Sequence, residues 1–354
     1  MWPWAEDCVR LPGEMSNGRP WPKVSIVTPS YNQARFLEAT IRSVLLQGYP
    51  NLEYAVIDGG STDGSTELIQ RYASRLPRWV SEPDVGQADA INKGWRRAQG
   101  DILAYLNSDD LYLLGAVRRA VEYLEDHPHV GIVYGACQVI DELGQPIGGP
   151  REMPECSLAR LLRCPLPQPT MFFRRWVFDR IGWLDAGLHC TLDWDLTIRA
   201  AIAGIVIEPI PGPPLAAARV WDGAKTSNLF ELCVEESLRI RDKLLSHPSL
   251  PLPFREELVM SKAWVFLWPA YEYYVRGQIR SARRLLHRAV AIHPAIIAHP
   301  EFLGLYLRAL LGRSGSQAAR RLKARLTASA FLREAAAVLR KKRGKGSGWR
   351  WRAS

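Results

Sequence analysis

Residues 100–110 read Gly-Asp-Ile-Leu-Ala-Tyr-Leu-Asn-Ser-Asp-Asp. The apolar run from Ile102 to Leu106 has the length of a strand and is bounded by turn residues. A continuous apolar run of this kind is typical of a strand buried on both faces of a parallel sheet. The run ends abruptly in a polar cluster that comprises Asn107, Ser108, Asp109 and Asp110. The stretch therefore predicts an α/β fold with polar side chains at the carboxyl end of a central strand.

The polar cluster has two interpretations. In open α/β sheets, ligands bind beyond the carboxyl ends of the strands. Two adjacent carboxylates at that place are hard oxygen ligands, suited to Mg²⁺ or Mn²⁺ bridging a diphosphate. Alternatively, Asp109 and Asp110 cap the helix expected over Leu114–His127, since Asp is favoured at helix starts. The segment alone leaves both interpretations open.

Strand-like and helix-like segments alternate through the first 135 residues. Short apolar runs predict strands, and segments with one apolar face predict helices. The expected strands are Lys23–Pro29, Leu52–Ile57, Trp79–Val80, Ile102–Leu106 and Val130–Tyr134, and the expected helices are Arg35–Gln47, Glu67–Arg75, Gln87–Ala98 and Leu114–His127. This alternation is typical of βαβ units. We therefore expect a Rossmann-like, doubly wound and mostly parallel sheet.

The pattern changes after residue 135. The expected elements are a hairpin of Val139–Ile140 and Pro146–Ile147, a strand at Thr170–Phe173, helices at Trp176–Ile181 and Asp193–Ala203, and a last strand at Ile205–Ile210. From about Phe230 onward the sequence is helical. Trp264–Tyr274 and Ile279–Ile292 flank Gly277 and predict one helical hairpin of tetratricopeptide size. A single such unit does not support a repeat array.

The chain divides into four predicted segments. Residues 1–22, rich in Pro, Gly and Trp, form a loose N-terminal arm; 23–228 form the α/β domain; 229–312 form a helical extension; and 313–354 form a basic, partly disordered tail. The net charge of +10 is concentrated in that tail, because residues 313–352 hold 13 Lys and Arg and one acid, which leaves 33 basic and 35 acidic residues elsewhere. The basic character therefore does not indicate a nucleic-acid-binding body.

Other features bear on location. The six cysteines are scattered without a CxxC pair, which argues against a zinc site or disulfide framework and fits a reducing compartment. No signal peptide and no run of 18 apolar residues is visible, so we expect a cytoplasmic protein. The basic tail has two interpretations: a helix lying on anionic lipid with Trp349 and Trp351 at the interface, or a solvated tail.

Four expected strand ends carry polar clusters, at residues 30–32, 58–65, 84–89 and 107–110. All would gather on one edge of the sheet, where a ligand site is the better explanation than four ordinary turns. Tyr31 could stack on a base or simply pack at the rim, and Asp58 could accept from a base imide N–H. For Asp63, capping of the following helix is the preferred interpretation. The glycine spacing matches neither a Walker loop nor GxGxxG, which disfavours an ATPase or a dinucleotide enzyme.

These blocks resemble a known family, the inverting glycosyltransferases of family 2 with the GT-A fold. The resemblance is carried by Val24–Asn32, Asp58–Ser65, Asp84–Gly94 and Gly100–Asp110, which follow the family's order and spacing across about residues 22–225. It implies a site for a nucleotide-diphosphate sugar, most simply a UDP-sugar. The donor-binding residues that we predict are Pro29, Tyr31, Asn32, Asp58, Gln87, Asp89, Lys93, Asn107, Ser108, Arg219 and Lys225.

The resemblance also implies a divalent metal, Mn²⁺ or Mg²⁺. Asp109 is similar to the second acid of the family's DxD motif, and Asp110 is its neighbour, so both are predicted metal ligands. The first acid of that motif is Asn107 here. This departure weakens the expectation of two direct carboxylate ligands, unless Asp110 or water compensates.

The second half of the domain is expected to bind the acceptor. Leu192–Arg199 resembles the family's acidic motif, in which an aspartate acts as general base on the acceptor hydroxyl; Asp193 is our first choice and Asp195 the second. The alternative is that Asp193 caps the helix and Asp195 strengthens its positive end. Trp221 departs from a frequent His in the family's loop after the last strand, while Arg219 and Lys225 remain for phosphate.

We therefore expect an inverting, metal-dependent transferase of the hexosyltransferase type. It would transfer a sugar to a glycan or lipid-linked acceptor in synthesis of a bacterial cell-surface polysaccharide or glycolipid, with peripheral contact to the inner face of the membrane and no nucleic-acid partner. A catalytically silent nucleotide-sugar-binding scaffold is the alternative, favoured by Asn107 and Trp221. A nucleotidyltransferase is disfavoured, since residues 30–33 do not resemble a triphosphate loop.

Overall fold

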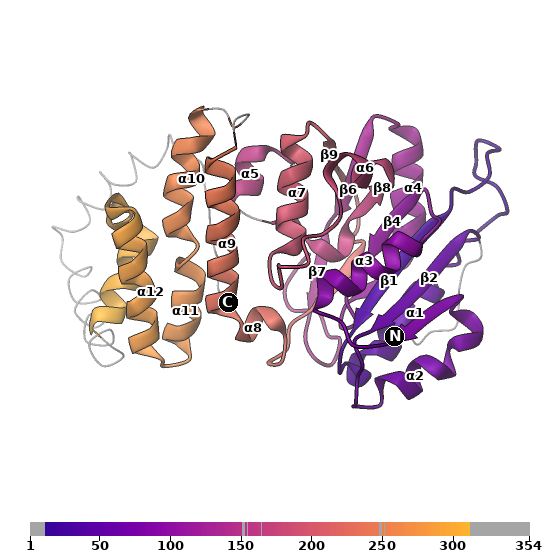
Figure 1. Cartoon of the computed structure of the whole chain (residues 1–354), viewed down its shortest axis with the longest axis horizontal. Coiled ribbons are helices and arrows are strands. Elements are labelled where there is room, and N and C mark those ends of the chain that lie inside the picture. The colour runs from indigo at the N-terminus through magenta and orange to yellow at the C-terminus, as the bar shows by residue number, and fades with distance from the viewer. Residues whose placement is uncertain are drawn as a thin grey trace, which may run out of the picture. The chain divides into compact units, whose positions relative to one another are not determined.

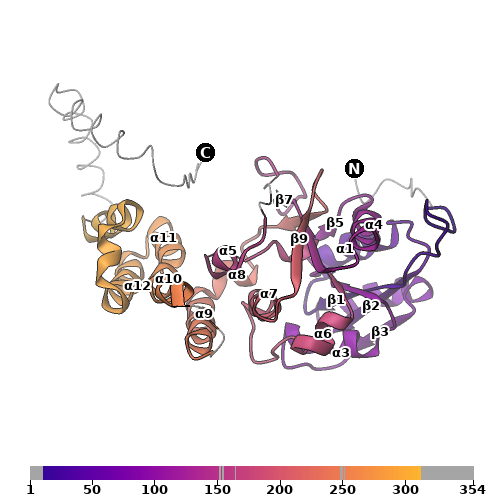
Figure 2. The ribbon, with the colours of Figure 1, turned by 90° about the horizontal axis from the view of Figure 1, so that it is seen from above.

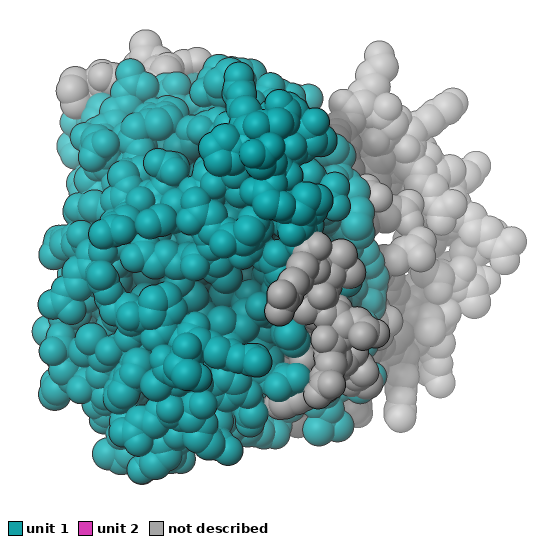
Figure 3. Space-filling model, turned by 90° about the vertical axis from the view of Figure 1, so that its right-hand side faces the viewer, with its two compact units in different colours: residues 1–261 teal, residues 262–354 magenta. Residues whose placement is uncertain are grey.

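The computed structural model describes residues 11–150, 153, 155–163, 165–247, 250 and 252–311. The chain separates into two compact units, residues 1–261 and 262–354 (Figure 1). Both sheets lie in the first unit. The teal surface in the space-filling view of Figure 3 is one face of that unit. The predicted division at residue 228 stays a prediction, and the predicted tail lies outside the described residues.

The main sheet of the first unit is mostly parallel. Its strands lie in the order β3 (Arg78–Ser81), β2 (Leu52–Asp58), β1 (Val24–Ser30), β4 (Ile102–Tyr105), β8 (Phe172–Arg174), β6 (Val130–Gly135) and β9 (Val206–Ile210). β8 runs antiparallel to its neighbours β4 and β6, whereas the other neighbouring pairs are parallel. The predicted doubly wound, mostly parallel α/β fold is therefore confirmed.

Helices cover both faces of this sheet (Figure 2). One face packs against α1 (Ala34–Leu45), α2 (Ser65–Arg71) and α4 (Ala116–Asp126). The other face packs against α3 (Gln87–Arg97), α6 (Trp176–Ile181) and α7 (Leu192–Ile202). α1 and α3 present to the sheet the apolar stripes that the sequence pattern predicted, and burial of apolar side chains against the sheet supplies the main stabilising term.

The parallel register brings the polar strand ends to one edge. Ser30 at the end of β1 is paired with Asp58 at the end of β2, and Asp58 is paired with Ser81 at the end of β3. Tyr105, the last residue of β4, is paired with Val27. The predicted gathering of polar clusters on one edge of the sheet is confirmed.

A second, three-stranded sheet was not predicted. It has the order β5 (Leu111–Tyr112), β10 (Ala216–Arg219) and β7 (Cys137–Ile140). The expectation that Ile205–Ile210 is the last strand is thus wrong, because β10 follows it. The sequence of β10, Ala-Ala-Ala-Arg, has little intrinsic strand preference, so pairing with its two neighbours decides its conformation. The expected hairpin after β7 is confirmed by a bridge between Ile140 and Pro146.

The described part of the N-terminal arm, residues 11–22, is mostly exposed but packs through two side chains. Met15 and Trp21 are buried, and the Trp21 indole N–H donates to the carbonyl of Pro12 at 2.9 Å. The Trp21 ring also meets the Tyr49 ring edge-on, with 5.3 Å between the centroids. Two aromatic contacts hold this segment, which a periodicity criterion does not detect.

The remaining elements are mostly helical. In the first unit these are η1 (Ala73–Arg75), α5 (Leu158–Arg163), η2 (Gln168–Thr170), α8 (Lys225–Asn228) and α9 (Phe230–Leu245). α10 (Leu252–Trp264) crosses the boundary between residues 261 and 262. The second unit contains α11 (Leu267–Val275), α12 (Ile279–Ile292), η3 (Pro294–Ala298) and a helix over residues 300–311. The helical hairpin around Gly277 is confirmed. Among the described residues, no helix is long and apolar enough to cross a membrane.

Close packing of α3 on the sheet gives a test of the fold. A Cβ at Gly94 would lie 2.6 and 2.7 Å from the two γ-methyls of Val27 in β1. We predict that Gly94→Ala lowers the free energy of unfolding by about 1–3 kcal/mol through overpacking, although alanine favours helix. Chemical denaturation measures the change. Gly13→Ala is the control, since nothing lies within 4 Å of that site; equal stability of Gly94→Ala and wild type would contradict the packing.

Candidate active site

The turn at residues 107–110 connects the two sheets. Its carbonyl oxygens at Ser108 and Asp110 lie 2.9 and 2.8 Å from the hydroxyl of Thr40 in α1. The Asp110 carboxylate accepts the main-chain N–H of Arg219 in β10 at 2.9 Å. Asp110 is buried, and burial together with the charge of Asp109 raises its pKa well above the ordinary range. Asp110 therefore holds β10 on the turn.

Neither aspartate of the turn caps the next helix. α4 begins at Ala116, and its N-cap residue is Gly115 in the left-handed conformation. The helix-capping interpretation of Asp109 and Asp110 is therefore wrong, because four residues, 111–114, lie between the turn and the cap.

Asn107 forms a bridge between two glutamines. Its Oδ1 accepts from Nε2 of Gln87 at 2.5 Å, and its Nδ2 donates to Oε1 of Gln168 at 3.0 Å. Nε2 of Gln168 donates in turn to the carbonyl of Tyr105 at 2.9 Å, which fixes the orientation of that amide. Residue 107 therefore has to supply one acceptor and one donor. Asparagine supplies both, whereas an ionised aspartate would supply only acceptors. This gives a physical reason for the departure from the family's motif.

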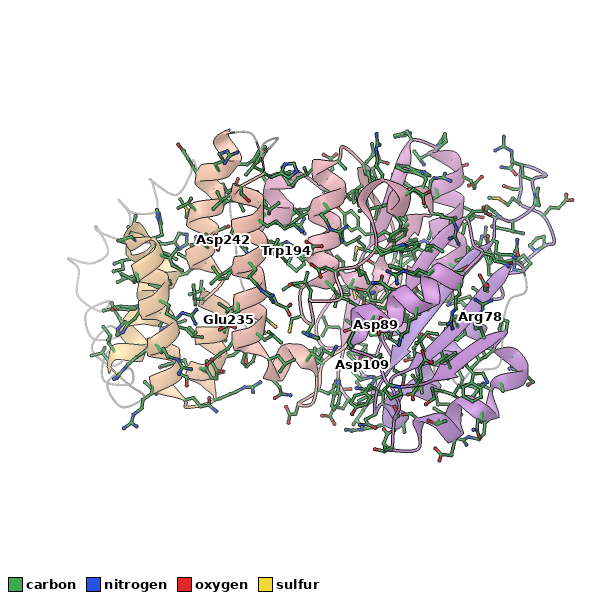
Figure 4. All side chains as sticks on the ribbon, viewed as in Figure 1. Arg78, Asp89, Asp109, Trp194, Glu235 and Asp242 are labelled. Atoms are coloured by element: carbon green, nitrogen blue, oxygen red, sulfur yellow. The ribbon has the colours of Figure 1, made fainter. Side chains whose placement is uncertain are left out.

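Asp109, labelled in Figure 4, is half-buried, whereas Asp110 is buried. Oδ2 of Asp109 accepts the indole N–H of Trp221 at 3.0 Å. Among the described residues, no group of three or more His, Cys, Asp and Glu could hold a metal ion. A divalent cation here would rest on Asp109 and on substrate phosphates, an arrangement that suits Mg²⁺ and related ions. The donor set fits such a shared metal and does not fit a site made of protein ligands alone.

Arg219 is engaged by main-chain oxygens. Its guanidinium donates to the carbonyls of Asp109, Asp141 and Glu142 at 2.9, 3.0 and 3.0 Å, and it lies over the Phe36 ring at 4.7 Å. These contacts fasten the hairpin after β7 onto the turn. Phosphate binding by Arg219 stays a prediction, and the contacts favour a supporting part for this side chain.

The loop after β2 is organised by Asp58. Its carboxylate is buried and accepts from the main-chain N–H groups of Gly60 and Ser61 at 3.1 and 2.9 Å. It also accepts from the hydroxyls of Ser61 and Ser81 at 2.5 and 2.8 Å. Both oxygens are therefore in use, and the predicted contact to a base stays a prediction.

The residues after β1 lie beside this loop. Asn32 has a positive φ of 52°, and its main-chain N–H donates to Ser61 Oγ while its Oδ1 accepts from Thr62 N–H. Tyr31 is 62% exposed, and its ring lies against Gly59, at which a Cβ would be 3.3 Å from Tyr31 Cδ2. An exposed ring on a fixed turn is available for stacking on a base. Pro29, within β1, precedes this turn.

The start of α3 carries two further predicted groups. Gln87 links Asn107 to α8, because its Oε1 accepts from Lys225 Nζ at 2.9 Å. Lys93 lies six residues further along α3, where its ammonium pairs with Asp89 at 3.2 Å and with Glu82 at 3.4 Å. Lys225 is therefore at the turn with Asn107, whereas Asp89 and Lys93 hold the loop before α3.

The two acidic candidates of α7 differ in their surroundings. Asp195 is buried and forms an ion pair with Arg199 of the same helix at 2.7 Å, so its negative charge is already paired. Burial raises the pKa of Asp193 to about 6, opposed by hydrogen bonds from main-chain N–H groups. A pKa near neutrality is what a general base requires. The helix begins at Leu192 with Thr191 as N-cap residue, so Asp193 is not the cap.

The charges of Asp193 and Asp110 both influence Tyr105, the last residue of β4. Burial raises the pKa of the Tyr105 hydroxyl well above its ordinary value, and the charges of Asp193 and Asp110 add to this effect. The charges of two acidic segments that are far apart in sequence thus both act on the same buried hydroxyl.

Several residues of the site were not predicted. Gln168 and Ser81 contact predicted residues but come from segments without a recognisable motif. Ser30 Oγ and Gln33 Oε1 are buried without a hydrogen-bond partner in the described part of the chain. An unpartnered buried hydroxyl is costly and is often satisfied by a ligand or water. Only the structure shows that signal.

Fold and site together define a glycosyltransferase-like α/β protein, and comparisons identify the family. The model of the family described as Glycosyl transferase family 2 matches residues 25–182. An uncharacterized glycosyltransferase of Mycobacterium tuberculosis (strain ATCC 25618 / H37Rv) is 32% identical over 197 residues, which are 53% of this chain and 71% of the relative. The chain belongs to glycosyl transferase family 2.

Other similar proteins cover the chain differently. An uncharacterized glycosyltransferase of Nostoc sp. is 28% identical over 176 residues, 46% of this chain, and the match spans about half of the relative, 54%. The solved structure of S. aureus TarS in complex with UDP-GlcNAc has a TM-score of 0.54 at 16% identity and covers 81% of this chain and 90% of that one.

The mannosyltransferase PcManGT from Pyrobaculum calidifontis, solved in complex with GDP-Man and Mn²⁺, has a TM-score of 0.54 at 20% identity. The match covers 82% of this chain and 84% of that one. Likeness to solved structures at these identities shows the fold alone, which is the GT-A fold of glycosyltransferases. The predicted family and fold are thus confirmed.

The amide bridge at Asn107 gives a second test. We predict that Asn107→Asp destabilises the protein by about 1–3 kcal/mol, because a carboxylate oxygen would face Oε1 of Gln168 with no proton between them. Thermal and chemical denaturation measure the loss. Asn17→Asp is the matched control, since Asn17 is exposed and its Oδ1 accepts the Arg19 N–H, which a carboxylate oxygen would also accept. A loss no larger than that of the control would contradict the bridge.

Proposed function

We propose that this protein transfers a sugar from a nucleotide-diphosphate sugar to a hydroxyl of its acceptor with inversion of configuration. The observation that supports the proposal most is the raised pKa of Asp193, in a domain whose 107–110 turn carries the Asp109 carboxylate and lies at Gln87, the partner of Lys225. A carboxylate of raised pKa and groups that can bind a diphosphate are what this reaction requires.

The donor would lie along the carboxyl edge of the sheet. Tyr31 would stack on the base near Asp58, and Lys225, held by Gln87, would offer its ammonium to the diphosphate. Asn107 and Ser108 would shape the floor beneath the sugar. Mn²⁺ or Mg²⁺ bound at Asp109 would neutralise negative charge on the departing nucleoside diphosphate. Asp110, which faces β10, would support Asp109 rather than act as a ligand.

Asp193 would be the general base. Its carboxylate accepts the proton of the acceptor hydroxyl as that oxygen forms a bond to the anomeric carbon. The bond from the anomeric carbon to the diphosphate oxygen breaks on the opposite side, so the configuration inverts. Asp195 is disfavoured for this role, because its pairing with Arg199 stabilises the charge that a base must give up on protonation.

Names of similar proteins support a role in cell-surface polysaccharide synthesis. TuaG of Bacillus subtilis, named for teichuronic acid biosynthesis, is 38% identical over 106 residues, 29% of this chain and 42% of TuaG. TarS was solved with UDP-GlcNAc, which supports a UDP-linked hexosyl donor, although PcManGT was solved with GDP-Man. We propose a glycan or lipid-linked acceptor at the inner face of the membrane, with the basic tail outside the described residues providing the contact.

A catalytically silent, nucleotide-sugar-binding protein is the second candidate. The observation that favours it is the hydrogen bond from Trp221 to Asp109, which occupies one oxygen of the predicted metal ligand. Such a protein would bind donor without turnover, so binding and turnover have to be measured separately.

Donor binding tests the role of Asp109. We predict that one nucleoside diphosphate among UDP, GDP, CDP and ADP stabilises the wild type in the presence of Mn²⁺, by about 2–4 kcal/mol at saturation. Asp109→Asn should abolish the part of this stabilisation that depends on Mn²⁺. Thermal unfolding and calorimetric titration measure the effect.

Asp126→Asn is the control for Asp109→Asn, because Asp126 is an exposed carboxylate at the end of α4. Asp109→Asn binding that keeps its full dependence on Mn²⁺ would rule out Asp109 as the metal ligand. Absence of any nucleotide effect on the wild type would contradict the donor site itself.

Turnover tests the role of Asp193. We predict that Asp193→Asn lowers kcat by at least about 100-fold with little change in donor affinity, since only proton transfer is lost. In the wild type, kcat should fall below about pH 6, where Asp193 becomes protonated. Asp179→Asn, an exposed aspartate in the first turn of α6, is the control and should keep both kcat and the pH profile.

Stability gives an independent readout for Asp193. Because its pKa is raised on folding, the folded state binds the proton more strongly than the unfolded state, and wild-type stability falls as pH rises from about 4 to 6. Asp193→Asn removes that loss and should be more stable than wild type at pH 8 by about 1–2 kcal/mol. Equal stability of the two proteins at pH 8 would refute the perturbed carboxylate.

A further inference from the structure

Glu236 is a buried carboxylate that the sequence motifs did not indicate. It lies in the second turn of α9, beyond the residues 25–182 that the family model matches. Its exposed fraction is 0%. A carboxylate in such a place is costly unless hydrogen bonds replace its hydration. The partners of Glu236 therefore indicate why it is there.

Those partners all belong to one short loop. Oε1 accepts the main-chain N–H of His189 at 2.7 Å, and Oε2 accepts the main-chain N–H groups of Cys190 and Thr191 at 2.9 and 3.1 Å. The Thr191 hydroxyl donates to the same Oε2 at 3.0 Å. Four hydrogen bonds to an ionised carboxylate are strong, and they fix the direction of three consecutive peptide groups.

This loop leads directly into the candidate base. Thr191 is the N-cap residue of α7, and Asp193 is the second residue of that helix. A shift of residues 189–191 would therefore move the first turn of α7 and the Asp193 carboxylate with it. A displacement of about 1 Å at a reacting group is enough to lower a rate by about 100-fold.

The same loop contacts the donor side of the site. The His189 ring lies over Gly86, where a Cβ would come within 2.9 Å of Nδ1. Gly86 is the N-cap residue of α3, has a φ of 132°, and precedes Gln87, the partner of Asn107 and Lys225. Residues 189–191 thus lie between the start of α3 and the start of α7.

α9 is itself held firmly against α7. Arg241, on the same helix as Glu236, lies over the Trp194 ring at 4.4 Å. It also donates to Ser261 Oγ at 2.8 Å and to the carbonyl of Leu162 at 3.1 Å. α9 therefore supports α7 at two places, through Glu236 at the loop that leads into α7 and through Arg241 at Trp194.

We propose that Glu236 is a positioning residue that sets the distance between the Asp193 base and the bound donor by holding residues 189–191 against Gly86. This inference rests on the proposed transferase function. It makes α9 a required part of the catalytic unit, although α9 contributes no group that touches the substrate.

Glu236→Gln tests the proposal with little change of shape. Its amide nitrogen replaces one oxygen and meets N–H groups that need an acceptor. Glu235→Gln is the matched control, because Glu235 is the exposed neighbour on the same helix and carries the same charge (Figure 4). We expect kcat to fall at least 10-fold in Glu236→Gln with donor affinity within twofold of wild type, and Glu235→Gln to match wild type in both.

Amide hydrogen exchange gives a second readout that does not depend on turnover. Peptides covering residues 189–191 should exchange at least 10-fold faster in Glu236→Gln, while peptides from β1 should be unchanged. Thr191→Val removes only the hydroxyl contact and should lower kcat by about threefold in the same direction. If Glu236→Gln fails to fold, the kcat of Thr191→Val tests the proposal instead.

The outcomes separate the two claims. Unchanged kcat in Glu236→Gln, whether or not exchange is faster, would refute the positioning role while leaving the transferase intact. Wild type that binds no nucleotide and turns over no donor would refute the proposed function, and with it a role of Glu236 in that reaction. Unchanged exchange at residues 189–191 would show that Glu236 does not hold the loop.

Discussion

The site depends on a buried polar turn, residues 107–110, placed between two sheets. Taking Asp110 and the carbonyls of the turn out of water costs free energy unless each finds a partner. The partners come from α1, from η2, from the start of α3 and from β10, through Thr40, Gln168, Gln87 and Arg219. Satisfying one turn therefore fixes the relative positions of four elements that are distant in sequence.

The same constraint explains which carboxylate is available for chemistry. Asp110 is directed inward and used by β10, so Asp109 is left at the surface of the turn with Trp221 on one oxygen. Across the edge, Asp195 is paired with Arg199 and Asp193 keeps a raised pKa. At both places one acid of a pair supports the fold, and the other is the acid that we propose to face the ligand. A buried glutamate on α9 then sets the acceptor side relative to the donor side.

Much of this arrangement could be predicted from the sequence, because it is local or periodic. The apolar run of β4, the striped helices α1, α3 and α12, and the polar clusters after β1, β2 and β4 all leave a pattern within a few residues. The parallel register then gathers those clusters without further information. What was missed depends on pairing across the chain. β10 is alanine-rich and becomes a strand only between β5 and β7, and the packing of Trp21 on Tyr49 joins segments without periodicity.

The contacts that orient the side chains of the site could not be predicted either, because they also join segments distant in sequence. Nothing near Asn107 indicates that Gln87 and Gln168 will meet it, and nothing near Glu236 indicates that three N–H groups 45 to 47 residues earlier will need it. The most direct test of the account is a crystal structure with the bound nucleoside diphosphate and Mn²⁺. It predicts an anomalous manganese peak at the Asp109 carboxylate, with the diphosphate beside Lys225 and Asn107 still bridging its two glutamines. A manganese ion held by Asp110 or by the α7 aspartates, or a diphosphate bound away from the 107–110 turn, would contradict it.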